Sequence, residues 1–334
     1  MSGTDGLALA TRGLRKRYGS RRALDGLDLS VPTGVVYGFL GPNGAGKTTT
    51  MRVLTGLIHA DGGTVEVLGR PFRRGDRHRL FEVGALVESP TFYPYLSGRA
   101  NLRELAASGA HVSSKRIDEL LELVGLSDRA KDKVQDYSMG MKQRLGIGAA
   151  LLSDPKLLLL DEPANGLDPA GIVAMRDTLR ALASQGKTVV VSSHLLGEVQ
   201  VMADTVGIIA AGKLVREGPL RELLSMQRVV KVRVRPNLVD AAIKALASFA
   251  PAERLTETDR DEGWLAVRAE ADCAEEVNQL LAGAGIFASG LESGSDLEML
   301  FLELTGGQAV SGEGTFVGLD AANGSATVGK GTAA

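Results

Sequence analysis

Short apolar runs alternate with amphipathic stretches along the first two thirds of the chain. The apolar runs that lack polar alternation are Val35–Leu40, Leu157–Leu160 and Thr188–Ser192. Such runs are typical of strands that are buried on both faces of a parallel sheet. Helical spacing of apolar residues separates them, in the segments Ser114–Val124, Gly140–Leu152 and Gly171–Ser184. Residues 65–69 and 206–218 predict shorter antiparallel strands, and the whole pattern predicts an α/β fold.

A second pattern follows residue 226 and predicts a small α+β accessory domain over residues 227–304. Its expected strands are Val229–Val234, Trp264–Ala269 and Ile286–Leu291, and its expected helices are Leu238–Phe249, Ala274–Ala282 and Leu297–Leu304. Charge divides the chain at the same place, because residues 1–226 carry a net charge of +5 and residues 227–304 one of −6. Residues 305–334 are rich in Gly and Ala without an apolar period, which predicts a disordered tail.

Composition narrows the classes of function. The chain has 334 residues, enough for about two domains, and its formal net charge of −2 gives no reason to expect a nucleic-acid partner. A single cysteine, Cys273, excludes an internal disulfide and fits a reducing compartment. No apolar run approaches the ~20 residues of a membrane span, so a role at a membrane would require another chain to supply the span.

A glycine-rich loop stands between the first buried run and a helical stretch. Residues 41–48 match the pattern G-x-x-x-x-G-K-[ST], in which backbone N–H groups and a helix N-terminus bind phosphates. Lys47 is expected to reach the β- and γ-phosphates, and the Thr48 hydroxyl to bind Mg²⁺. The expected nucleotide-binding residues here are Gly41, Pro42, Asn43, Gly44, Ala45, Gly46, Lys47, Thr48 and Thr49.

Two carboxylates end the second buried run. Asp161 is suited to holding Mg²⁺, directly or through water, and Glu162, one residue further, is suited to polarising an attacking water. His194 follows the third run, where it would contact the γ-phosphate or orient Glu162. Taken alone, a pair of solvated acids and a surface histidine remain the alternatives.

The order of these motifs, with Tyr137–Arg144 and Asn165–Asp168 between them, resembles the ATP-binding-cassette (ABC) ATPases over residues 7–222. The most similar subgroup is the cassette subunits of bacterial antibiotic and bacitracin-type exporters. The resemblance implies a P-loop NTPase fold with a helical subdomain, ATP and Mg²⁺ as ligands, and His194 as the switch histidine.

The same resemblance extends the set of expected site residues. Tyr18 matches the aromatic residue that stacks on adenine, and Asp168 matches the loop that crosses the dimer interface. Ser138 and Gly140 match the loop that closes over the γ-phosphate bound to the opposite subunit. Met139 and Met141 replace the glycine and glutamine that are common in this loop, a departure that leaves the serine and the second glycine in place.

Glu88 is a more informative departure. It follows the strand-like run Val83–Val87, at the place where most members of the family have a glutamine that contacts Mg²⁺. We expect Glu88 beside the metal, although a solvated carboxylate at a strand end is the alternative. The following stretch, Pro90–Leu96, is rich in aromatic residues. In the family this region docks a short helix of the membrane subunit, a contact of helix-in-groove type.

The resemblance therefore implies the ATP-binding and ATP-hydrolysing subunit of a two-component exporter. Two copies would clamp two ATP molecules and drive a separate permease, with an antibiotic or antimicrobial peptide as cargo. The protein would be cytoplasmic, bound through the permease to the inner face of the plasma membrane, with no nucleic-acid partner. One alternative is a soluble ABC regulator without a permease, although such chains usually carry two cassettes or a long coiled-coil insertion. Another is a subunit of a lipid or polysaccharide exporter.

Overall fold

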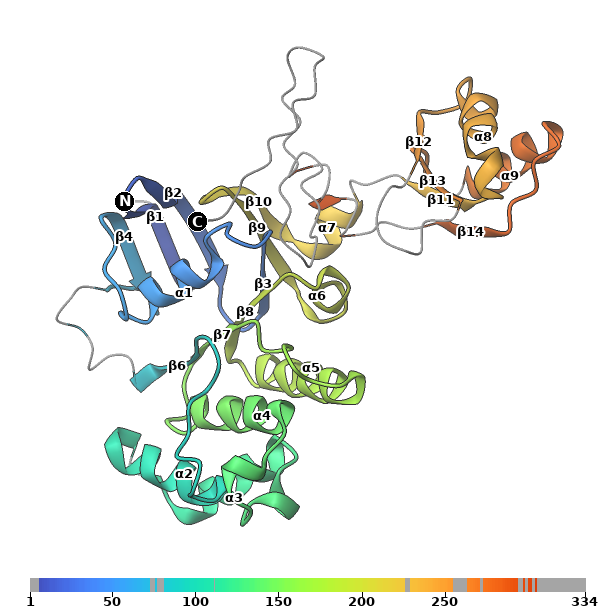
Figure 1. The fold of residues 1–334 in the computed structure, drawn as a ribbon. Helices are drawn as coiled ribbons and strands as arrows, with labels where there is room; N and C mark the ends of the chain where they lie inside the picture. The colour runs from blue at the N-terminus through green and yellow to red at the C-terminus, as the bar shows by residue number, and fades with distance from the viewer. Residues whose placement is uncertain are drawn as a thin grey trace, which may run out of the picture.

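A six-stranded sheet with the order β10-β9-β3-β8-β7-β6 lies at the centre of the structure, a computed structural model (Figure 1). Its strands are β3 (Val36–Leu40), β6 (Val83–Leu86), β7 (Leu157–Asp161), β8 (Thr188–Ser193), β9 (Thr205–Ala210) and β10 (Lys213–Pro219). All neighbours pair in parallel except β10, which runs antiparallel to β9. The carboxyl ends of the parallel strands therefore meet at one edge, where α/β proteins place their ligands.

The structure describes residues 6–72, 76, 81–110, 112–225, 229–254, 263–270, 273–293, 297, 300–301 and 304. The tail expected at 305–334 lies outside these residues. Within them, no helix combines the length and the apolar composition needed to cross a membrane.

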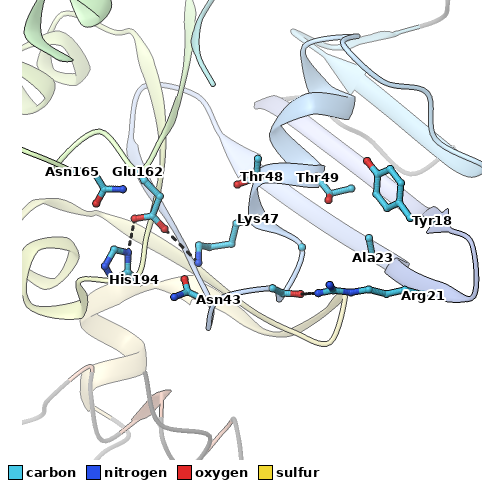
Figure 2. Close-up of a pocket in the computed structure, with 12 residues that line it drawn as sticks. Tyr18, Arg21, Ala23, Asn43, Lys47, Thr48, Thr49, Glu162, Asn165 and His194 are labelled. Carbon is cyan, nitrogen blue, oxygen red and sulfur yellow. Dashed lines mark hydrogen bonds and ion pairs between the residues drawn. The ribbon is translucent and has the colours of Figure 1, made fainter. Parts of the chain in front are cut away.

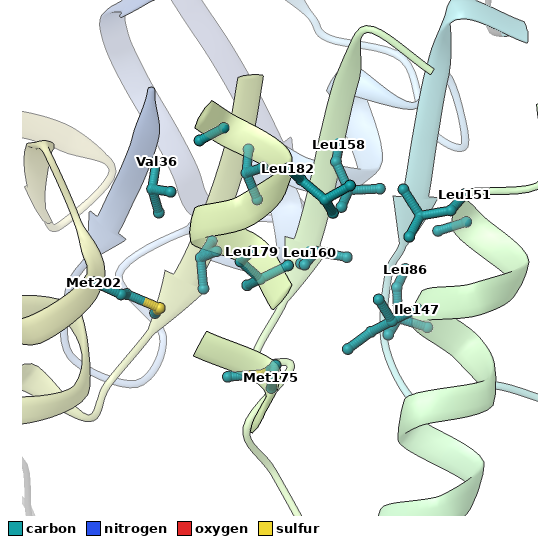
Figure 3. Packing of buried hydrophobic residues seen from close by; sticks show 14 of the residues in the cluster. Val36, Leu86, Ile147, Leu151, Leu158, Leu160, Met175, Leu179, Leu182 and Met202 are labelled. Atoms are coloured by element: carbon teal, nitrogen blue, oxygen red, sulfur yellow. The ribbon is translucent and has the colours of Figure 1, made fainter. Parts of the chain in front are cut away.

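Successive residues of the central strands are buried on opposite faces of the sheet, as their unbroken apolar runs predict. Leu158 and Leu160 pack with helices α4 (Met139–Ala150), α5 (Pro169–Ser184) and α6 (Leu196–Met202) on one face (Figure 3). Leu157 and Leu159 pack on the other face with helix α1 (Lys47–Leu54) and with a second sheet. All four leucines are at most 1% exposed.

The second sheet has the order β2-β1-β4-β5 and is antiparallel. It consists of β1 (Leu7–Tyr18), β2 (Arg21–Pro32), β4 (Gly62–Val67) and β5 (Arg70–Pro71). The first two strands form a hairpin whose last pair is Tyr18 and Arg21. This hairpin brings the end of β1 beside the glycine-rich loop.

Three helices form a subdomain beyond the edge strand β6: α2 (Gly98–Leu105), α3 (Ser114–Leu123) and α4. Each begins at a serine whose hydroxyl accepts a hydrogen bond from a backbone N–H three residues later, the usual N-cap arrangement. Figure 1 shows this group apart from the antiparallel sheet. The helical subdomain, the P-loop and the central sheet confirm the expected fold class.

The accessory unit has the order β-α-β-β-α-β and a ferredoxin-like sheet order, β12-β13-β11-β14. Helix α7 (Leu220–Ser225) precedes it. Its elements are β11 (Val230–Arg233), α8 (Val239–Leu246), β12 (Ala252–Arg254), β13 (Trp264–Val267), α9 (Ala274–Gly283) and β14 (Gly290–Ser293). The pattern predicts neither β12, which is only three residues long, nor the start of β14 at Gly290. Ile286 was expected in that strand, but it lies in the connection after α9, where its side chain is buried against the accessory core.

The chain returns to the first unit after β14. Leu297, Leu300 and Phe301, spaced as one face of a helix, are at most 6% exposed and belong to the same apolar cluster as Leu196 and Val199 of α6. The Leu297 N–H donates to Gln200 Oε1 at 2.9 Å. The boundaries at residues 226 and 304 stay a prediction, but this last helical segment packs with the core of the first unit and not with the accessory sheet.

We expect Phe301→Ala to lower the free energy of unfolding by about 3–5 kcal/mol, because it removes a buried aromatic ring and leaves a cavity. Phe287→Ala is the matched control: that ring is 77% exposed, so the change should stay within about 0.5 kcal/mol. Denaturant unfolding of both variants measures the difference. Equal stability of the two variants would show that the returning segment adds nothing to the core.

Candidate nucleotide site

A cavity of about 560 Å³ opens at the carboxyl edge of the central sheet. Its lining residues come from the β1–β2 hairpin, the glycine-rich loop with the start of α1, and the segments after β7 and β8. They are Tyr18, Arg21, Ala23, Asn43, Gly44, Gly46, Lys47, Thr48, Thr49, Glu162, Asn165 and His194. In Figure 2, Glu162 and His194 lie at one end of the cavity and Tyr18 at the other, with Lys47 and Thr48 between them.

The glycine-rich loop is shaped by close packing against its neighbours. A Cβ atom at Gly41 would lie 2.5 Å from the Ile209 carbonyl oxygen, and Gly46 has φ +116°, a conformation that favours glycine. Gly46 is also the N-cap of α1, and the first turn of this helix, with its free N–H groups, lines the cavity. Together they form an anion-binding site of the P-loop kind.

Lys47 is 6% exposed, and the loop itself holds its ammonium group. Nζ donates to the Gly41 carbonyl oxygen at 2.6 Å and lies 3.4 Å from Glu162 Oε1. A cation fixed between the glycine-rich loop and a carboxylate is placed to contact phosphate oxygens.

Glu162 is held in a single position by its backbone and its side chain. Its N–H donates to Ser192 Oγ at 3.0 Å, and its Oε2 lies 2.7 Å from His194 Nδ1. Its backbone is left-handed, with φ +49°, which is unfavourable for a residue with a Cβ and is most often found where function requires it. The geometry joins Glu162, His194 and Lys47 in one contact chain, as an acid–base site requires.

Tyr18 and Arg21 form the far end of the cavity. The Tyr18 ring is 46% exposed, and Lys16 Nζ lies 5.6 Å from its centroid. Arg21 donates from Nη2 to the Gly44 carbonyl oxygen at 3.2 Å. An exposed ring beside a phosphate loop offers a stacking surface for a base.

Ser138, Gly140 and Asp168 lie outside this cavity but close to one another. Ser138 and Asp168 are both exposed, and each caps a helix by accepting a backbone N–H, from α4 and α5 respectively. A Cβ atom at Gly140 would lie 3.1 Å from the Gly166 carbonyl oxygen, so the first turn of α4 touches the loop before Asp168. The structure thus brings these three residues together, at a place separate from the cavity.

The expected metal ligands divide between two places. Thr48 lines the cavity, and Asp161, 5% exposed, ends β7 with its Oδ1 accepting a hydrogen bond from Ser192 Oγ. Glu88 lies beyond β6 and makes an ion pair with Arg52 of α1. Among the described residues there is no group of three or more His, Cys, Asp and Glu able to hold a metal. Hard oxygen donors in such small number fit Mg²⁺, which usually keeps water and phosphate ligands.

The side-chain amide of Asn101 holds the backbone of the aromatic stretch Pro90–Leu96 in place. Asn101, 1% exposed, accepts from the Tyr93 N–H and donates to the carbonyl oxygens of Tyr93 and Leu96. The Tyr93 and Tyr95 rings lie 6.0 Å apart and are 54% and 63% exposed. The stretch is a rigid loop that presents two aromatic rings to the surroundings.

The sequence profile of the ABC transporter family matches residues 24–165. A bacitracin transport ATP-binding protein, BcrA of Enterococcus faecalis, is 36% identical over 91% of this chain and 98% of its own length. The chain belongs to the ABC transporter family. The BcrA of Bacillus licheniformis, also a bacitracin transport ATP-binding protein, is 46% identical over 66% of this chain and 72% of its own length. SrtF of Streptococcus pyogenes, a lantibiotic transport ATP-binding protein, is 43% identical over 63% of this chain and 90% of its own length.

Solved structures agree with this assignment. An ATP-binding cassette of an ABC transporter in its ADP conformation aligns with a TM-score of 0.59 and 26% identity, over 66% of this chain and 95% of its own. A nucleotide-free cassette aligns with a TM-score of 0.58 and 25% identity, over 64% and 91%. The chain is thus an ABC ATPase, which binds ATP and couples its hydrolysis to transport, and the expected family and fold are confirmed.

Within this ABC ATPase, sequence reasoning missed three residues of the cavity, Arg21, Ala23 and Asn165. Asn165 belongs to a motif that the sequence analysis used, and its place between Glu162 and Asp168 was the available indication. The Arg21 side chain donates to a backbone carbonyl oxygen, a role that leaves no spacing pattern. The particular roles of the individual site residues remain predictions.

Proposed function

We propose that this chain is the ATP-hydrolysing subunit of a two-component exporter of antibiotics or antimicrobial peptides. It would work as a pair of copies, with a separate permease at the inner face of the plasma membrane and with Mg²⁺ beside the ATP. The observation that carries the cargo class is the similarity to the Enterococcus BcrA, which includes the accessory unit as well as the cassette.

Hydrolysis in this proposal depends on Glu162 as the base. Its carboxylate takes a proton from the attacking water, while His194 at 2.7 Å fixes its orientation. Lys47 stabilises the phosphate charge. Thr48 and Asp161 would hold Mg²⁺, which would neutralise phosphate charge, and Glu88 would act on the metal from the neighbouring strand.

A second copy would complete each site. Ser138 and Asp168 are exposed, Gly140 is half-buried between them, and none of the three lines the cavity of its own chain. Ser138 offers a hydroxyl and the N-terminus of a 12-residue helix, groups suited to a phosphate. These residues therefore support a head-to-tail pair in which each copy closes the cavity of the other.

The permease would be contacted through the loop that carries Tyr93 and Tyr95. Two exposed rings on a backbone held by Asn101 suit the docking of a short helix from another chain. The stretch that carries these rings begins at Pro90, two residues after Glu88, so nucleotide and permease would act on neighbouring parts of one segment.

The test is antibiotic resistance in the source organism. Deleting the gene for this chain should increase sensitivity to bacitracin or to a lantibiotic several-fold and leave sensitivity to rifampicin, the matched control drug, unchanged. The wild-type gene should restore resistance, and a Glu162→Gln copy should not. Unchanged sensitivity to every peptide antibiotic tried would contradict the proposed cargo class and leave the ATPase assignment intact.

A further inference from the structure

Arg52 connects two parts of the nucleotide site that are far apart in the sequence. It lies in the last turn of α1, the helix that begins with Lys47 and Thr48. Its Nη2 makes an ion pair with Glu88 Oε1, and the two side chains are 36% and 54% exposed. None of the family motifs described above includes Arg52.

The hydrogen bond to Glu88 raises the pKa of Arg52 above its usual range. One cation thus joins the last turn of α1 to the carboxylate that follows β6.

The backbone at Glu88 supports a functional reason for this pair. Glu88 has φ +67°, the same left-handed region as Glu162. Two acidic residues at the ends of adjacent parallel strands, β6 and β7, therefore both adopt a backbone conformation that is unfavourable for a residue with a Cβ atom. Such strain persists where surrounding contacts hold it, and the Arg52 ion pair is one contact that holds the Glu88 side chain.

We propose that Arg52 is a positioning residue of the nucleotide site: its guanidinium group is the counter-ion that holds Glu88 beside the helix that begins with Lys47 and Thr48. This inference deepens the proposed function and rests on it. A carboxylate without its counter-ion would repel the phosphates of ATP, because like charges disfavour each other's approach. Arg52 therefore offsets the negative charge of Glu88, at a position where a glutamine would carry no charge.

Equilibrium binding of ATP to the full chain tests the proposal, with EDTA in one series and Mg²⁺ in the other. Arg52→Met keeps the length of the side chain and removes its charge. It should weaken ATP binding in EDTA roughly two- to fivefold, the range that a half-exposed ion pair supports. The loss should be smaller with Mg²⁺, because the metal then offsets the Glu88 charge. The double variant Arg52→Met, Glu88→Gln should recover most of the affinity lost.

Arg99→Met is the matched control, because Arg99 makes an ion pair of similar exposure with Asp118, and neither residue lines the cavity. Its ATP affinity should equal that of the wild type. Unchanged affinity in Arg52→Met would overturn the proposal, as would a loss that Glu88→Gln fails to recover. Failure of the wild-type chain to bind ATP would overturn the proposed function and this inference together, whereas unchanged antibiotic sensitivity on gene deletion would leave the binding result standing.

Discussion

Replacing Glu162 by glutamine is expected to slow ATP hydrolysis about 10²–10⁴-fold, the usual contribution of a general base. The amide keeps the size of the side chain and the backbone hydrogen bonds to Ser192, but it cannot take a proton from water. ATP should still bind, because Lys47 and the glycine-rich loop are unchanged. Phosphate release in steady state gives the rate of hydrolysis. Size-exclusion chromatography with ATP should show more dimer for this variant than for the wild-type chain, because the wild type hydrolyses the ATP that holds the dimer together.

The matched control for this variant is Asp154→Asn. Asp154 is also an acidic residue with positive φ, +50°, but it is 70% exposed and paired with Lys187 away from the cavity. Its replacement should leave the rate of hydrolysis unchanged. A Glu162→Gln variant with the turnover of the wild type would rule out Glu162 as the base.

Lys47→Ala is expected to weaken ATP binding and to lower turnover together with it. The ammonium group makes charge-assisted hydrogen bonds, each of which contributes about 1.5–3 kcal/mol, so affinity should fall by roughly ten- to a hundredfold or more. An electrostatic penalty adds to this loss of ATP affinity, because the Glu162 carboxylate would lose the cation that lies 3.4 Å from it and would repel the phosphates. Equilibrium binding of a fluorescent ATP analogue measures the change.

Lys156→Ala provides the comparison for Lys47, since Lys156 is 72% exposed and pairs with Glu82 on the surface. It should bind ATP like the wild type. If Lys47→Ala kept its affinity and lost only turnover, the lysine would act on the reacting phosphate alone and not on ATP binding.

The sequence was informative where a residue type is required by its own chemistry. The glycine-rich loop, the acidic pair after β7 and His194 could be recognised because phosphate binding and acid–base chemistry restrict the residues allowed there. Contacts to backbone atoms leave no such restriction, and Arg21 was missed for that reason. Glu88 was recognised as unusual, but its pairing with Arg52 depends on how α1 and β6 are arranged.

The two long strands of the hairpin, β1 and β2, were missed for a different reason. Their pairing has several register shifts, one of them between Thr11 and Leu14, and each shift interrupts the alternation from which a strand is recognised. The basic residues of β1 also dilute its apolar pattern. Periodicity did find the helical segment around Leu297–Leu304, but periodicity alone cannot tell which core a helix packs against.

The return of that segment to α6 affects the order in which the protein can fold. Val36 of β3 and Phe301 share one apolar cluster, although nearly the whole described chain lies between them. Closing so long a loop adds little to the entropic cost, which grows only with the logarithm of its length. During synthesis, however, the ribosome releases Phe301 after every strand of the accessory sheet. The accessory unit is therefore an insertion within the ATPase core, and its strands are available for pairing before that core can be completed.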